Sequence, residues 1–182
     1  VWAENYNRRA LRSEVGLVFQ YPEHQLFESD VLSDVCFGPM NQGKSREEAE
    51  EEAKKALLQV GFKEKNFKKS PFDLSGGQKK RVAIAGVLAM NPKILILDDS
   101  ASALDFATDA ALRKAIKEET HGMTVFIVSQ RAASVQRADH ILVLDDGKLV
   151  GDAPHAELLR SCEVYKEICL SQLSKEEVAK TL

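Results

Sequence analysis

The sequence predicts an α/β fold built on a parallel sheet, and three stretches carry that prediction. Residues 93–97 form a short apolar run without alternation, which is typical of a parallel strand buried on both faces, and the run ends in Asp98 and Asp99. A stripe of small apolar residues at helical spacing, within residues 82–89, precedes this strand. A second apolar run covers residues 123–128. Because open α/β sheets bind ligands at the carboxyl ends of their strands, the two acids mark the expected binding edge.

Composition narrows the class of protein. The 182 residues are 44% hydrophobic and 29% charged, which suits a globular chain with one domain of ordinary size and room for a subdomain. The net charge of -3 gives no reason to expect nucleic acid as a partner. Three cysteines at no metal or redox spacing favour a reducing compartment. No apolar run approaches the roughly 18 residues that span a bilayer. The first residue is Val1, which leaves room for a missing upstream part.

The first third of the chain predicts one strand and one long helix. Residues 1–13 are polar and basic and carry no clear signal, whereas residues 14–20 predict a strand with alternate side chains facing inward: Val15, Leu17 and Phe19. Residues 45–60 predict a solvated amphipathic helix that ends at Gly61, and residues 62–72 predict a basic connector. Beyond residue 137, two apolar runs flank Asp145-Asp146-Gly147 and predict a hairpin, and the chain from Pro154 onward predicts helix.

Residues 38–45 match the P-loop pattern G-x-x-x-x-G-K-[ST] letter for letter. A working P-loop follows a buried strand and opens a helix whose N-terminus faces phosphates. Here the helix begins with Arg46 and then carries glutamates at residues 47, 48 and 50–52. Carboxylates suit that end of the helix dipole but repel a triphosphate placed there. We therefore expect the match to be fortuitous.

A glycine-rich turn, Leu74-Ser75-Gly76-Gly77-Gln78, opens the helix that carries the small-residue stripe. The first amides of such a helix lack internal partners and point outward, as an anion site requires. Together with the strand that ends in Asp98 and Asp99, this arrangement resembles the signature sequence and Walker B strand of the ATP-binding cassette (ABC) ATPases. Residues 15–98 resemble the ATPase subunits of energy-coupling-factor importers, and residues 94–169 resemble the nucleotide-binding domains of ABC exporters. A hybrid of the two is plausible.

The resemblance implies a fold and a division of the chain. The fold is a P-loop NTPase (RecA-like) parallel sheet of ABC type that lacks its N-terminal strands and carries a helical subdomain. The expected RecA-like ATP-binding core comprises residues 1–22 and 73–182, with helices at its C-terminal end. The expected helical subdomain comprises residues 23–72 and leads to the signature sequence.

The resemblance also implies ATP and Mg²⁺ as cofactors and assigns a role to each matching position. Asp98 holds the metal, and Gln20, at the Q-loop position, reaches the metal and links it to a transmembrane partner. Asp99 orients or activates the attacking water, and Gln130, at the switch position, touches the γ-phosphate. The residues expected to bind nucleotide across a dimer of ABC subunits are those of the signature and of the D-loop: Ser75, Gly76, Gly77, Gln78 and Asp105.

Three departures from the family pattern bear on activity. Residues 1–182 contain no P-loop upstream of Gln20. Asp99 stands where the family has a glutamate, and its shorter side chain falls roughly 1.5 Å short, a large error for in-line phosphoryl transfer. Gln130 stands where the family has a histidine and carries no charge near neutral pH. We therefore expect residues 1–182 by themselves neither to bind ATP tightly nor to hydrolyse it.

Three functions remain at this point. The first is the ATP-binding subunit of an ABC transporter, peripheral on the cytoplasmic face of the cell membrane. There it would pair with a second ABC ATPase subunit and a transmembrane subunit. The second is a non-catalytic partner that lends its signature to a competent subunit, which the missing P-loop and the Asp99 and Gln130 pair favour. The third, a soluble ABC ATPase outside transport, is disfavoured by the importer-like and exporter-like flanks.

Overall fold

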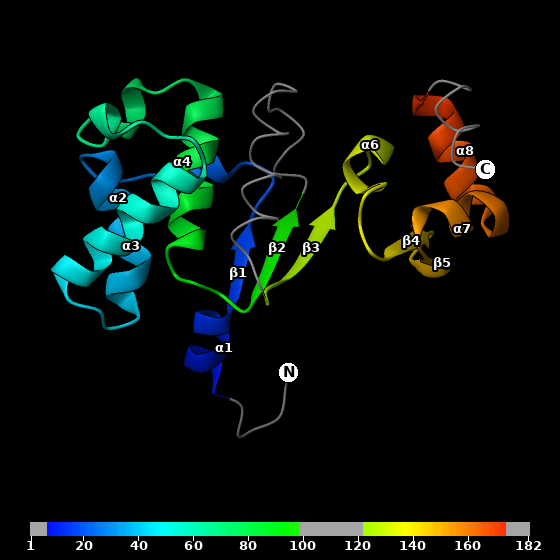
Figure 1. Cartoon of the computed structure of the whole chain (residues 1–182), viewed down its shortest axis with the longest axis horizontal. Helices are drawn as coiled ribbons and strands as arrows, with labels where there is room; N and C mark the ends of the chain where they lie inside the picture. The colour runs from blue at the N-terminus through cyan, green and yellow to red at the C-terminus, as the bar shows by residue number, and fades with distance from the viewer. Residues whose placement is uncertain (1–6, 99–121, 174–182) are drawn as a thin grey trace. The chain divides into compact units, whose positions relative to one another are not determined.

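The computed structural model describes residues 7–98 and 122–173 (Figure 1). The chain separates into two compact units, Val1–Val128 and Ser129–Leu182. Each unit has its own cluster of buried apolar side chains. The expected boundaries of the helical subdomain, at residues 23 and 72, stay a prediction.

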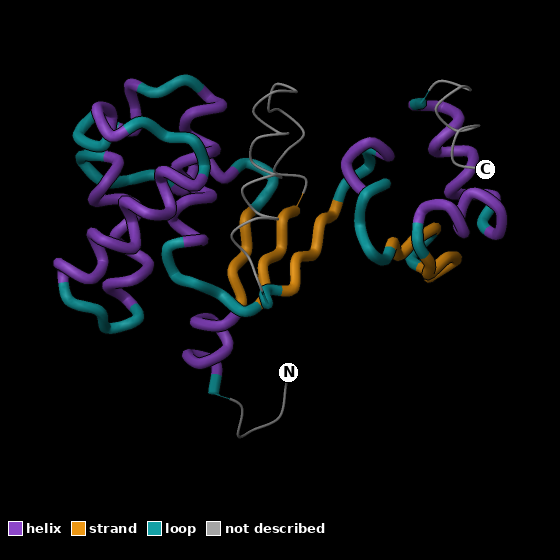
Figure 2. The backbone as a smooth tube through the Cα atoms, viewed as in Figure 1, coloured by secondary structure: helices purple, strands orange, loops and turns teal. Residues whose placement is uncertain are grey.

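The first unit is built on a parallel sheet of three strands, β1 (Val15–Val18), β2 (Ile94–Asp98) and β3 (Thr124–Val128). Their order is β1-β2-β3, so β2 lies between the other two (Figure 2). Val18 pairs with Leu97, and Asp98 pairs with Val128. The predicted α/β class with a parallel sheet is confirmed.

The predicted inward face of β1 is wrong. The buried residues are Gly16 and Val18, whereas Leu17 and Phe19 are 38% and 51% exposed. The reason is helix α4 (Gly76–Leu88), which packs against the strand so tightly that a Cβ added at Gly16 would lie 2.5 Å from Cγ1 of Val87. Only glycine leaves room for that approach, so the strand turns its bulky residues to the other side.

The opposite face of the sheet is only partly covered. Along β2 one face is buried and the other is half-buried, so its predicted burial on both faces holds fully for one face and partly for the other. Phe126 and Val128 of β3, which share that face with Leu17, are 48% and 53% exposed. The apolar residues that made these strands recognisable are thus divided between a packed face and an accessible one.

Helices α2 (Val31–Asn41), α3 (Arg46–Gln59) and α4 gather on one side of the sheet (Figure 1). Asp30 caps the first of them through the Ser33 amide, and Ser45 and Ser75 cap the next two. Two helices were not predicted individually: α2, and α1, which is capped by the Asn7 side chain and ends at Glu14, directly before β1. The helical segments are α1 (Arg8–Glu14), η1 (Pro22–Gln25), α2 (Val31–Asn41), α3 (Arg46–Gln59), η2 (Glu64–Asn66), η3 (Pro71–Asp73) and α4.

The second unit is a hairpin with helices packed on it. Strands β4 (Ile141–Asp145) and β5 (Lys148–Ala153) pair antiparallel around a turn in which Asp146 and Gly147 have φ of 46° and 74°. Positive φ at both positions is the type I′ geometry that the Asp-Gly sequence predicts. The helices of this unit are α6 (Ala132–Val135), α7 (His155–Ser161) and α8 (Glu163–Gln172). No helix within residues 7–98 or 122–173 combines the length and apolar character needed to cross a membrane.

Candidate functional site

The carboxyl edge of the sheet brings together two of the predicted site residues. Asp98 ends β2, and Gln20 follows β1 by two residues, next to the Val18–Leu97 pair. Gln20 is exposed and Asp98 is half-buried. An amide oxygen and a carboxylate on adjacent parallel strands are oxygen donors of the kind that Mg²⁺ prefers. Asp99 and Asp105 lie outside the described residues.

The signature turn, defined as residues 74–78, forms the N-terminus of α4. The Ser75 hydroxyl oxygen accepts from the Gln78 amide at 3.4 Å, and the Gln78 side-chain oxygen accepts from the Ser75 amide at 3.0 Å. This reciprocal pair is a capping box. The predicted contact of Gln78 with nucleotide remains a prediction, because in this structure its side chain caps the helix.

The same turn can accept an anion. The amides of Gly76 and Gly77, in the first turn of α4, have no acceptor inside the helix, and Ser75 takes only the Gln78 amide. A Cβ added at Gly76 would meet nothing within 4 Å, so the space above the turn is open. No acidic residue lies in the first turn. The turn therefore offers two free N–H groups and the Ser75 O–H to a phosphate, at the positive end of the helix dipole.

Magnesium ATP fits these donors only in part. Within the described residues no three His, Cys, Asp or Glu side chains are grouped so as to hold a metal ion by themselves. Mg²⁺ usually takes one or two protein carboxylates and completes its shell with water and phosphate oxygens, so Asp98 and Gln20 suffice once a nucleotide is bound. The metal would thus bind only together with a nucleotide, whose phosphate oxygens complete its shell.

Residues 38–45 do not form a P-loop, because every motif position has another structural task. Gly38 lies inside α2, where a Cβ would come within 2.7 Å of Met90. Gly43 takes a φ of 100°. Lys44 pairs with Glu52 at 3.2 Å, and Ser45 caps α3 in a second capping box. The segment joins two helices instead of a strand and a helix, so the fortuitous match is confirmed.

Gln130 belongs to the second unit. It is exposed, and its backbone carbonyl accepts from the Gln172 side chain at 2.8 Å. The Gln172 side-chain oxygen in turn accepts from the Ala132 amide at 2.9 Å. Helix α8 thus holds the backbone of this segment while the Gln130 side chain stays accessible.

A surface feature behind the Q-loop position was not predicted from the sequence. Phe27 and Phe37 form an edge-to-face pair with ring centroids 4.8 Å apart, and they are 55% and 46% exposed. One Asp34 oxygen accepts from the amides of Phe27 and Glu28 at 2.8 and 2.9 Å, which holds the loop on α2. We name Phe27 and Phe37 the aromatic patch. Its only signal in the sequence is the aromatic spacing of residues 27 and 37, which is unremarkable by itself.

The sequence profile of the family described as ABC transporter matches residues 2–102. The energy-coupling factor transporter ATP-binding protein EcfA2 of Clostridium perfringens is 44% identical over 165 residues, which cover 88% of this chain and 58% of that protein. EcfA2 of Streptococcus pyogenes is 48% identical over 150 residues, covering 81% and 54%. The chain therefore spans a little over half the length of these curated relatives. An alignment that covers 81% of the chain is longer than residues 15–98, so the likeness to importer ATPases continues past Asp98.

Solved structures are similar as well. A bacterial Atm1-family ABC exporter with ATP bound superposes with a TM-score of 0.74 and 30% identity, over 91% of this chain and 29% of that chain. The ATP-binding cassette MJ0796, in a dimeric post-hydrolysis state bound to ADP and Pi, gives a TM-score of 0.73 and 28% identity, over 83% and 68%. The predicted likeness to both importer and exporter ATPases is confirmed.

Proposed function

Because this chain belongs to the ABC transporter family, we propose that it is a transporter's ATP-binding subunit, coupling ATP binding and hydrolysis to the movement of a substrate across a membrane. One observation carries the proposal. The open, acid-free N-terminus of α4 and the Gln20–Asp98 edge of the sheet lie in one unit, which offers separate donors to phosphate and to metal. The names of the relatives support the coupling to transport.

In this proposal the chain's residues divide the work. Asp98 and Gln20 would hold Mg²⁺, which would offset the negative charge of the phosphates. Asp99 orients the attacking water, and Gln130 donates to the γ-phosphate. The amides of Gly76 and Gly77 and the Ser75 hydroxyl close over a nucleotide held by a second ABC subunit, with Asp105 at the interface between subunits.

The aromatic patch supports a transmembrane partner. Two half-exposed phenyl rings, held in place by the Asp34 carboxylate, present an apolar contact behind the Q-loop position. Exposed aromatic groups on a rigid support are what protein interfaces favour. We assign this patch to the transmembrane subunit and place the chain on the cytoplasmic face of the membrane.

A second candidate function is a non-catalytic partner. Two positions favour it: Asp99 has a shorter side chain than the glutamate of the family, and Gln130 cannot become charged. Such a chain would hydrolyse nothing at its own site while its signature turn completed the site of the partner subunit. The direction of transport and the substrate are open under both candidates.

The test is steady-state phosphate release by the assembled transporter at saturating Mg-ATP. Asp98→Asn removes the charge that holds the metal and should lower turnover more than 100-fold if this site is catalytic. Asp139→Asn makes the same change at an exposed residue of the second unit and should leave turnover within twofold. Full turnover in Asp98→Asn, together with loss in Ser75→Asp, would favour the non-catalytic partner. Full turnover in both variants would contradict both candidates.

A further inference from the structure

Residues 38–45 look like a phosphate loop and are not one, so the segment has another task. Its central residue, Gln42, follows the last residue of α2. The Gln42 side-chain nitrogen donates to the Met90 carbonyl at 3.0 Å and to the Ser13 carbonyl at 3.4 Å. Both acceptors are carbonyl oxygens, so only the amide nitrogen can face them. A single side chain thus joins three segments that are distant in the sequence.

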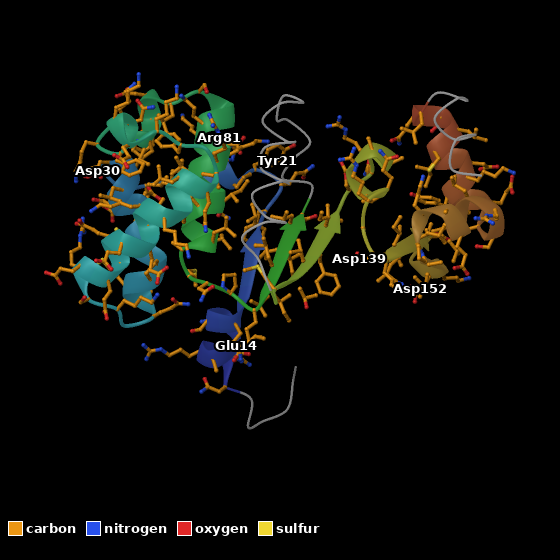
Figure 3. All side chains as sticks on the ribbon, in the orientation of Figure 1. Glu14, Tyr21, Asp30, Arg81, Asp139 and Asp152 are labelled. Atoms are coloured by element: carbon orange, nitrogen blue, oxygen red, sulfur yellow. The ribbon has the colours of Figure 1, made fainter. Side chains whose placement is uncertain are left out.

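The two acceptors sit where two strands begin. Ser13 lies in the last turn of α1, just before β1, and Met90 lies between α4 and β2. The same joint is tied by the Lys93 amide, which donates to the Glu14 carbonyl at 2.8 Å, and by an ion pair of the two side chains at 2.7 Å. Figure 3 shows Glu14 at this junction of α1 and β1.

The joint is also closely packed. A Cβ at Gly38 would lie 2.7 Å from the Met90 side chain and 3.2 Å from the Gly86 carbonyl, so α2 and α4 cross almost in backbone contact. Immediately after Met90, Asn91 takes a φ of 50° and Pro92 follows, which ends α4 and turns the chain into β2. The angle between α4 and the sheet is therefore set by Met90, Asn91 and Pro92. Gln42 donates a hydrogen bond to the first of these three residues.

We propose that Gln42 is a positioning residue that fixes the angle of α4 and thereby the distance of the signature turn from the sheet edge. The turn lies at the far end of a helix of 13 residues, about 20 Å from the joint at 1.5 Å per residue. A tilt of about 5° at the joint would then displace the signature turn by about 1.7 Å, over a helix of that rise per residue. Displacements near 1 Å are enough to lower catalytic rates strongly. The effect of this displacement on ATP hydrolysis rests on the proposed function, whereas the positioning of α4 by Gln42 does not.

The experiment measures the geometry first, without nucleotide. Nitroxide labels at Asp73→Cys, next to the signature turn, and Val128→Cys, at the carboxyl end of β3, report the distance between the turn and the sheet edge. Both positions are exposed, whereas the native cysteines within the described residues are buried and react slowly. Gln42→Met keeps the side-chain length without donors, and Gln42→Glu sets a carboxylate against two carbonyls. Asn41→Asp makes a matched amide-to-acid change at the exposed neighbouring residue.

We expect one narrow distance distribution in the parent and in Asn41→Asp, and a shift or broadening of about 2 Å or more in Gln42→Met, with unchanged helix content by circular dichroism. Unchanged distances in Gln42→Met, or an equal change in Asn41→Asp, would overturn the proposal. Unfolding of both Gln42 variants while Asn41→Asp stays folded would also overturn it, because that result shows a general role in stability.

The second measurement is phosphate release by the assembled transporter. Gln42→Met should lower kcat about tenfold and leave KM for ATP within twofold, since the displaced turn still binds but closes poorly. A shifted distance with normal kcat would overturn the positioning role. A parent complex without ATP hydrolysis would contradict the proposed function of the chain, while the distance measurement would still decide whether Gln42 sets the angle of α4.

Discussion

Helices α3 and α4 begin in almost the same way and differ in what their first turns can bind. Each is capped by a serine in a capping box, Ser45 with Glu48 and Ser75 with Gln78. The first turn of α3 carries Glu47 and Glu48, whereas that of α4 carries no acid. The helix that follows the complete P-loop pattern is thus the one whose first turn carries acids, which repel phosphate.

The comparison shows that the residues after the cap decide the chemistry of a helix N-terminus. Carboxylates in the first turn satisfy the dipole of α3 from within the chain. Glycines in the first turn of α4 leave that dipole and two amides available to an external anion. Lys44, the lysine of the apparent P-loop, is likewise engaged within the chain, because its side chain pairs with Glu52.

The sharpest way to break this comparison is to place the same acid at both caps. Aspartate caps a helix as well as serine does, so Ser75→Asp and Ser45→Asp should each leave thermal stability close to that of the parent. Ser75→Asp puts a negative charge where we expect phosphate, and phosphate release by the assembled transporter should fall more than 100-fold. Ser45→Asp is the matched control and should change the rate less than twofold. Equal effects at the two caps would show that the turns do not differ in function.

A smaller change is expected at Asp99 and Gln130, which are proposed to act on the nucleotide at this chain's own site. Asp99→Glu restores the carboxylate length of the family pattern, and it should raise turnover several-fold. Adding Gln130→His should raise turnover further, because the imidazole can carry a charge near neutral pH. Steady-state phosphate release at saturating Mg-ATP is the measurement. A double variant no faster than the parent would mean that the roles given to these two positions are wrong.

The two capping boxes should also respond differently to acid. Hydrogen bonds from Ser45, first from its backbone amide, lower the pKa of the Glu48 carboxyl below its ordinary value, whereas Gln78 does not titrate. A lowered folded pKa means that the unfolded chain binds the proton first. The stabilisation by Glu48 is therefore complete above about pH 4.5 and is lost as pH falls through the lower folded value. Urea unfolding between pH 3 and 6 should show a shallower loss in Glu48→Gln than in the parent. Identical slopes would contradict the assignment.

The smallest effect is expected at Lys44. Lys44→Ala removes a partly exposed ion pair and should change the free energy of unfolding by less than about 1 kcal/mol. Residues 1–182 should show no binding of Mg-ATP tighter than about millimolar by calorimetry, with or without this change, because phosphate contacts of a P-loop are missing from them. A micromolar Kd that Lys44→Ala abolishes would restore the P-loop reading of residues 38–45.

The sequence was enough to predict the sheet and the signature turn, because short-range chemistry determines both. Apolar runs predicted β2 and β3, alternation predicted β1, and the glutamates after Ser45 correctly argued against a phosphate loop. The side of β1 that is buried could not be predicted in the same way. Bulky Leu17 and Phe19 suggested the core, but the close approach of α4 selects the face of Gly16.

Long-range contacts account for the other omissions. The Gln42 amide reaches acceptors 29 and 48 positions away, and a lone glutamine carries no mark of such partners in the sequence. The aromatic patch depends on an Asp34 carboxylate that accepts from amides six and seven positions earlier. The expected contact of Gln78 with nucleotide came from the family pattern, which gives no information about the capping box that now occupies the side chain.

The pairing of β1 with β2 has a consequence for how the chain is made on the ribosome. The ion pair that joins the two strand starts links Glu14 and Lys93, which are 79 positions apart. At roughly 5–20 residues per second, β1 is synthesised about 4–16 s before its partner strand. During that interval α2 and α3 can already form and pack, while β1, with Leu17 and Phe19, has no strand to pair with. Slowing translation between codons 20 and 90 should therefore increase capture of the nascent chain by chaperones.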